Sequence, residues 1–157
     1  MTKTINITVA GLGGQGVLKA SDIVAEAVFA AGFDVKKSEV HGMSQRGGSV
    51  SSEVRYGECV ASPMVPAGEA DVLAVLDSTQ VEVARGVLKA DGVLITPEDL
   101  PLDKLQNPKA LNTMMLGAIS KHIEIPAETL LEALKANLPE KLHEMNVEMF
   151  NLGRNSR

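Results

Sequence analysis

A glycine-rich segment near the N-terminus has the residue types and spacing of a phosphate-binding loop. Gly11, Gly13 and Gly16 match the pattern G-x-G-x-x-G, which joins a strand to a helix in dinucleotide-binding folds. There the first glycine permits a tight turn, the second lets the backbone approach a phosphate, and the third permits contact between helix and strand. Amide groups at the start of the following helix also favour an anion. Together with Gly14 and Gln15, these residues form a candidate anion site. The alternative is a tight turn with no ligand.

A second polar segment, residues 39–50, is short and rich in glycine. Its Arg46 carries a planar guanidinium, whose fork of donors suits a phosphate or a carboxylate. Glu39 is the one candidate for the acidic residue that holds a ribose in dinucleotide-binding proteins. The alternative interpretation is a solvent-exposed turn in which Arg46 is a surface charge.

The elements around these segments alternate between strand and helix. Residues 4–10 have the alternation of a strand, and apolar residues then recur at helical spacing up to Gly32. We expect further strands at 33–40, 49–56, 71–77 and 92–96, and helices at 17–31, 80–89, 112–122, from 126 and at 140–152. The strand at 49–56 has the pattern of an antiparallel edge strand. The order predicts an α/β fold, a Rossmann-like three-layer sandwich with a mainly parallel sheet and C-terminal helices.

This fold would bring the two polar segments together. Loops that leave parallel strands emerge at the same carboxyl edge of the sheet, which is where ligands bind. The loops after the first two strands are therefore expected to lie side by side, with Asp77 at the end of a central strand on the same edge.

Composition excludes several classes of protein. The 157 residues carry 15 Lys and Arg against 20 Asp and Glu, and this moderately acidic balance argues against nucleic acid as a partner. The length predicts one domain, 1–157, and no segment is apolar for long enough to span a membrane. The one cysteine, Cys59, favours a cytoplasmic location and excludes an iron–sulfur cluster held by this chain alone.

The other reactive residue types form no recognisable catalytic set. His41, His122 and His143 are scattered without a spacing that would hold a metal, and Ser44 lacks the G-x-S-x-G context of a hydrolase nucleophile. We therefore predict no metal site and no catalytic residue that acts in this chain alone.

The two polar segments taken together resemble a known family. Gly11-Leu-Gly-Gly-Gln-Gly-Val17 and Glu39-Val-His-Gly-Met-Ser-Gln-Arg-Gly-Gly-Ser-Val50 are similar to the gamma subunit or gamma domain of the 2-oxoacid (pyruvate or ketoacid):ferredoxin oxidoreductases. The second segment looks most like the indolepyruvate type, in which that domain is a separate beta subunit. Asn146-Val-Glu-Met-Phe150-Asn-Leu-Gly153 is also similar to the family's closing helix. The resemblance covers nearly the whole chain.

The resemblance implies a role in a heteromeric enzyme complex. Such enzymes oxidatively decarboxylate a 2-oxoacid with coenzyme A, giving an acyl-CoA, carbon dioxide and reduced ferredoxin. It implies that thiamine diphosphate and iron–sulfur clusters sit on the partner subunits, while the gamma part packs beside the active site and contacts coenzyme A. By position, the resemblance implies a loop that faces a phosphate or a partner subunit and comprises Gly13, Gly14, Gln15 and Gly16. Its neighbour comprises Glu39, His41, Gly42, Ser44, Gln45, Arg46, Gly47 and Gly48.

Two other functions remain open at this point. G-x-G-x-x-G with Glu39 would also suit a stand-alone oxidoreductase or sensor that binds NAD or FAD. A structural scaffold, whose loops only dock a partner, is the third hypothesis.

Overall fold

The computed structural model describes residues 3–41 and 48–156, and for His41 the backbone only. The strands are β1 (Ile5–Leu12), β2 (Asp34–His41), β3 (Ser49–Gly57), β4 (Ala70–Val75) and β5 (Leu88–Ile95). The helices are α1 (Val17–Ala30), α2 (Val81–Ala84), α3 (Leu111–Ser120), α4 (Ala127–Ala136) and α5 (His143–Arg154). Short 3-10 turns join them: η1 (Ser78–Gln80), η2 (Arg85–Val87), η3 (Pro97–Asp99), η4 (Leu102–Lys104), η5 (Pro108–Ala110) and η6 (Glu140–Leu142).

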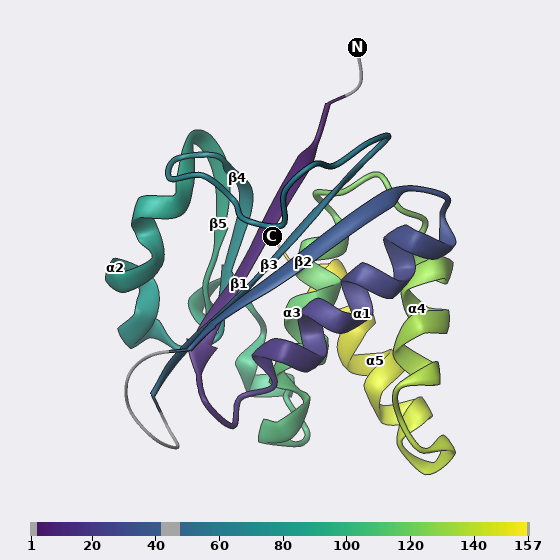
Figure 1. Cartoon of the computed structure of the whole chain (residues 1–157). Coiled ribbons are helices and arrows are strands. Elements are labelled where there is room, and N and C mark those ends of the chain that lie inside the picture. Colours follow the sequence, from purple (N-terminus) through teal and green to yellow (C-terminus); the bar gives the residue numbers. More distant parts are fainter. Residues whose placement is uncertain (1–2, 42–47, 157) are drawn as a thin grey trace.

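The five strands form one twisted sheet with the order β2-β3-β1-β4-β5 (Figure 1). β1, β4 and β5 pair in parallel, and β3 pairs antiparallel with both β1 and β2. In the described part of the chain, four strands therefore point the same way and β3 runs against them. The carboxyl ends of β1, β2 and β4 consequently lie at one edge of the sheet, together with the start of β3.

The two faces of the sheet are covered unequally (Figure 1). α1, α3, α4 and α5 cover one face and enclose the larger apolar core, whose largest fully buried side chains include Ile7, Met114 and Phe150. The other face carries a smaller cluster of Ala10, Leu73 and Val75 under α2 and its flanking turns. The predicted α/β sandwich with C-terminal helices is confirmed, with one thick and one thin helical layer.

Two sequence predictions about this sheet need correction. The strand at residues 49–56 is antiparallel as expected, but it lies inside the sheet between β2 and β1 rather than at an edge. The predicted helix at 80–89 is limited to the four residues of α2, flanked by η1 and η2, and β5 already begins at Leu88. Gly86 and several β-branched residues weaken a helix here. Lys89 is also held at the sheet by an ion pair with Asp71, with an Nζ–Oδ1 distance of 3.0 Å.

The crossing of α3 and α5 depends on two glycines. A Cβ atom at Gly117 would overlap the carbonyl oxygen of Phe150, and one at Gly153 would overlap the carbonyl oxygen of Met114. Each glycine therefore lets one helix backbone lie directly against the other. Beside the crossing, the buried Thr113 hydroxyl donates to Asn146 Oδ1 at 2.7 Å, and this bond fixes the register of the two helices.

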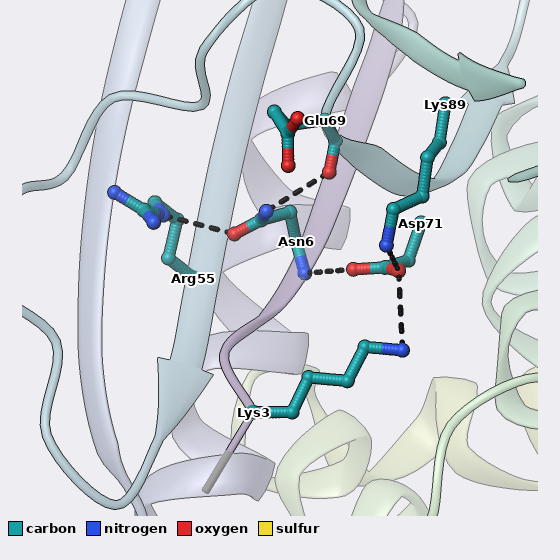
Figure 2. Close-up of polar contacts among 6 residues, drawn as sticks. All are labelled: Lys3, Asn6, Arg55, Glu69, Asp71 and Lys89. Carbon is teal, nitrogen blue, oxygen red and sulfur yellow. Dashed lines mark hydrogen bonds and ion pairs between the residues drawn. The ribbon is translucent and has the colours of Figure 1, made fainter. Parts of the chain in front are cut away.

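A polar network joins β1, β3, β4 and β5 near the opposite edge of the sheet (Figure 2). The buried Asn6 side chain donates to the carbonyl oxygen of Glu69 and accepts from Arg55 Nε, both at 2.9 Å. Its backbone N–H donates to Asp71 Oδ2 at 2.9 Å, while Lys89 donates to Asp71 Oδ1. The Asn6 side chain thus makes two hydrogen bonds, which link β1 to β3 and to the segment just before β4.

We expect Asn6→Ala to lower the free energy of unfolding by about 2 kcal/mol, because a carbonyl group and a guanidinium N–H lose their partner in a partly buried place. Chemical denaturation measures this change. Asn155→Ala, at an exposed position near the end of α5, is the control and should shift stability by less than about 0.5 kcal/mol. Equal effects of the two substitutions would contradict the role given to the network.

Candidate functional site

The side chain of Gln15 holds the first glycine loop in place. Its Oε1 accepts from the backbone N–H of Leu12 at 2.7 Å, and its Nε2 donates to Asp77 Oδ2 at 2.9 Å. The loop after β1 is thereby fastened to the segment after β4. Gln15 was predicted as a ligand contact, but both of its side-chain polar atoms already have partners within the chain.

The glycines of this loop have roles that differ from those expected. Gly11 belongs to β1, and a Cβ atom there would lie 2.8 Å from Gln15 Oε1. The turn itself is made at Gly14 and Gly16, whose φ angles are +90° and +83°. Gly16 also lies against Asn112 of α3, because a Cβ atom would overlap that side-chain amide. Gly14 is exposed and has open space around it.

The described end of the second segment lies beside this loop. The N–H of Gly13 donates to the carbonyl oxygen of Gly48 at 2.8 Å. In the strand register, Leu12 is opposite Ser49 and His41 is opposite Val50. β3 therefore brings the two segments to the same edge of the sheet. Gly42, Ser44, Gln45, Arg46, Gly47 and the His41 side chain lie outside the described residues.

Glu39 does not join the glycine loop. It lies in β2, which β3 separates from β1, and the register places it opposite Ser52 and thus level with Val9. Its Oε2 accepts from Lys37 Nζ at 2.6 Å. A dinucleotide site needs an acid at the end of the strand next to β1. The insertion of β3 removes Glu39 from that position.

The start of α1 has the features of an anion site. No side chain among the described residues caps this helix, and its first turn carries no acidic residue. The N–H groups of a helix start attract negative charge when nothing neutralises them. A cavity of about 380 Å³ lies next to Gly16, with Lys19 and Lys109 among its polar residues and an apolar wall from α4 and α5. This combination suits an anionic group attached to an apolar arm.

Asp77 organises the segment after β4. Its Oδ1 accepts from the Thr79 backbone N–H at 3.0 Å and so caps the turn η1, in place of the Thr79–Glu82 capping pattern visible in the sequence. Hydrogen bonds from the Thr79 hydroxyl and N–H, and then from Gln15, hold the pKa of the Asp77 carboxyl below its ordinary value. The carboxylate therefore stays ionised at neutral pH.

The stabilising effect of Asp77 is expected to depend on pH. Because the folded-state pKa is lowered, this contribution is present above the unfolded-state pKa of about 3.9 and is lost as the pH falls through the folded-state value. We expect Asp77→Asn to cost about 1 kcal/mol at pH 7, because a neutral amide accepts weaker hydrogen bonds than a carboxylate and its Nδ2 cannot accept the bond from Gln15. Unfolding measured from pH 7 to 2 should show the two proteins converging at low pH. A difference that does not change with pH would contradict this role.

Two contacts at this edge were not predicted. Asn112 Nδ2 donates to the carbonyl oxygen of Gly16 at 3.3 Å from a position 96 residues away. Ser49 Oγ donates to Gln80 Oε1 at 2.6 Å and joins β3 to η1. Asn112 belongs to no recognisable motif. Ser49 lies in the second segment, but nothing in the spacing of that segment pointed to a bond with Gln80.

The described residues form neither a metal-binding cluster nor a membrane-spanning helix. In residues 3–41 and 48–156, His, Cys, Asp and Glu do not gather in groups of three or more that would suit a metal ion. Within the same ranges, none of the helices has both the length and the apolar character needed to cross a membrane.

Comparisons with known proteins place the chain in a family. The sequence pattern of the family described as pyruvate ferredoxin/flavodoxin oxidoreductase matches residues 6–156. The indolepyruvate oxidoreductase subunit IorB of Methanothermobacter thermautotrophicus is 31% identical, over 94% of this chain and 95% of its own length. The chain therefore belongs to the pyruvate ferredoxin/flavodoxin oxidoreductase family, as the resemblance of the two glycine segments predicted.

Solved structures share the fold. The gamma subunit of a keto/oxoacid ferredoxin oxidoreductase from Geobacter sulfurreducens superposes with a TM-score of 0.80 at 25% identity, covering 95% of each chain. The 2-oxoglutarate:ferredoxin oxidoreductase of Magnetococcus marinus, solved with 2-oxoglutarate, coenzyme A and succinyl-CoA, gives 0.84 at 22% identity. That match covers 97% of this chain and 30% of the other. The same fold therefore occurs both as a separate chain and within a longer one.

Proposed function

We propose that this chain is the gamma-type subunit of a 2-oxoacid:ferredoxin oxidoreductase, an enzyme that oxidatively decarboxylates a 2-oxoacid to an acyl-CoA and reduces ferredoxin. The observation that carries the proposal is the match along almost the whole chain to a relative named as an oxidoreductase subunit. The names of the family and its members include pyruvate, indolepyruvate and 2-oxoglutarate. The substrate is accordingly a 2-oxoacid, with indolepyruvate as the first candidate to test.

The contribution of this subunit is to hold coenzyme A beside the active site. The uncapped start of α1 and the open, left-handed Gly14 offer backbone N–H groups to a phosphate. The adjacent cavity, with its lysines and apolar wall, fits a long arm that carries anionic groups. On sequence position alone, Arg46 and its neighbours in the second segment complete the contacts to coenzyme A.

The redox chemistry belongs to the partner subunits. A protein-bound iron–sulfur cluster takes about four cysteine thiolates, and this chain has one cysteine in all. The residues present therefore do not fit a cluster. Thiamine diphosphate and the clusters are assigned to the partners, and the cytoplasmic location expected from the cysteine content remains part of the proposal.

Reconstitution tests this division of labour. The chain is purified alone and after co-expression with its partner subunits, and 2-oxoacid-dependent ferredoxin reduction is measured with pyruvate, indolepyruvate and 2-oxoglutarate. We expect no turnover from the isolated chain and coenzyme A-dependent turnover from the complex. Turnover by the isolated chain, or failure to co-purify with the partners, would contradict the proposal.

The dinucleotide-binding alternative is not favoured. It requires an acidic residue beside the glycine loop, whereas Glu39 is two strands away and hydrogen-bonded to Lys37. The matched relatives and family also point to ferredoxin-linked enzymes. Calorimetry with NAD, FAD and coenzyme A would separate the two functions.

A further inference from the structure

β2 forms an open edge of the sheet. In the described part of the chain it pairs with β3 on one side, and no strand lies on its other side (Figure 1). A strand at such an edge presents unpaired backbone N–H and C=O groups, which form a template for another strand. β2 has eight residues, Asp34–His41, enough for several backbone hydrogen bonds.

The charges of β2 are complementary to those of a second, antiparallel β2. Antiparallel pairing about a two-fold axis at Ser38 places Lys37 of each copy opposite Glu39 of the other. Opposite charges in directly facing positions stabilise a strand pair, and like charges destabilise it. An axis at Lys37 or at Glu39 would instead place identical charges opposite each other. An axis at Val35 would place Asp34 opposite Lys36, but it would pair only residues 34–36 of β2. The axis at Ser38 pairs residues 35–41 and is therefore the favoured one.

Exposed apolar side chains flank the same edge. Phe29 is 71% exposed and Val40 52%, which makes them two of the most exposed large apolar residues of the described chain. Asp22, Ala25 and Phe29 follow one side of α1, and Asp22 lies 3.0 Å from Lys37 Nζ, so that side faces β2. An axis at Ser38 keeps both helical layers on the same side of the joined sheets. It thereby brings the α1 helices of the two copies toward each other above the seam.

We propose that two copies of this chain associate through antiparallel pairing of their β2 strands about an axis at Ser38. The two five-stranded sheets then form one continuous sheet. The Lys37–Glu39 pair within each copy becomes part of a network of four charges across the axis, with Asp22 next to each lysine. β3 lies between β2 and the strand that leads into the glycine loop, and the seam overlaps the second segment only at residues 39–41. The pairing therefore goes beyond the proposed function and does not depend on it.

Charge reversal tests the register. Lys37→Glu gives an edge with two glutamates, and Glu39→Lys gives one with two lysines. Sedimentation equilibrium should show a dimer for the wild-type chain and dissociation constants about tenfold or more higher for each variant alone. An equimolar mixture of the two variants should recover association, because every facing pair is then opposite in charge. Lys104→Glu and Glu98→Lys, at exposed positions elsewhere, are the controls and should leave the dimer intact.

A cross-link tests the axis independently of charge. In a Cys59→Ser background, Ser38→Cys places two cysteines opposite each other. Facing Cα atoms in an antiparallel pair are about 4.5–5.5 Å apart, within the range of a disulfide. Oxidised glutathione should link Ser38→Cys into a covalent dimer, whereas Lys36→Cys, whose facing residue is Val40, should stay monomeric on denaturing gels. A monomeric wild-type chain at all concentrations, no recovery in the mixture, or equal cross-linking of both cysteines would overturn the proposal.

Discussion

Gly153→Ala should destabilise the protein by about 3 kcal/mol or more. The added methyl group would overlap the carbonyl oxygen of Met114 and would lie 2.7 Å from its carbonyl carbon. A side chain could rotate away from such a contact, but the backbone of α3 cannot. Gly117→Ala should have a similar effect, because its methyl group would meet the backbone of Phe150. Chemical denaturation of each variant measures the loss.

Gly86→Ala is the matched control for this prediction. A Cβ atom there meets nothing within 4 Å, so stability should stay within about 0.5 kcal/mol of the wild-type value or rise slightly. Wild-type stability of Gly153→Ala would show that α3 and α5 do not cross at these glycines. α5 includes the segment from Asn146 to Gly153, which resembles the closing helix of the family. This result would leave the glycine at the end of that segment without a structural explanation.

Gly14→Ala is expected to raise the KM for coenzyme A at least about tenfold in the assembled enzyme, with little change in the KM for the 2-oxoacid. Gly14 lies in the left-handed region at the exposed tip of the loop, where an added methyl group would disturb the backbone offered to a phosphate. A tenfold change corresponds to about 1.4 kcal/mol of lost interaction. Steady-state ferredoxin reduction at varied coenzyme A measures it.

Gly32→Ala separates this effect from simple backbone strain. Gly32 has a φ angle of +99° and equally open space, but it follows α1 and lies at the other end of that helix from the loop. Both substitutions should lower stability by about 1–2 kcal/mol, because alanine is strained in the left-handed region. Only Gly14→Ala should change the KM for coenzyme A. The same KM in both variants would indicate that the loop docks a partner and does not contact coenzyme A.

Local sequence patterns were sufficient to predict most of the helices and strands. The alternation in β1, the helical spacing in α1 and the apolar run in β4 each reflect burial within a single element. The position of β3 was not predictable in this way, because an alternating pattern indicates one buried face but says nothing about which strands lie on either side. The helix expected at 80–89 is short because Gly86 and the β-branched residues disfavour it, and because Leu88 already pairs with Ala70 of β4. That strand pairing cannot be read from a local pattern.

Sequence patterns likewise located only part of the candidate site. The sequence located the glycine loop and, through the resemblance, the segment that meets it at Gly48. It did not show that Gln15 fastens the loop to Asp77, or that Asn112 packs on Gly16. Both contacts join residues more than sixty positions apart in the chain, and neither has a characteristic spacing. Glu39 matched a motif by its spacing, but the antiparallel β3 displaced it from the loop.

Coenzyme A binding to the partner subunits, measured by calorimetry with and without this chain, tests the central claim most directly. We predict that the partners alone bind thiamine diphosphate but bind coenzyme A at least about tenfold more weakly than the complete complex does, a difference of about 1.4 kcal/mol. Adding the wild-type chain should restore the affinity, and adding the Gly14→Ala variant should not. Equal affinity for coenzyme A in the absence of this chain would contradict the claim that its glycine loop holds coenzyme A.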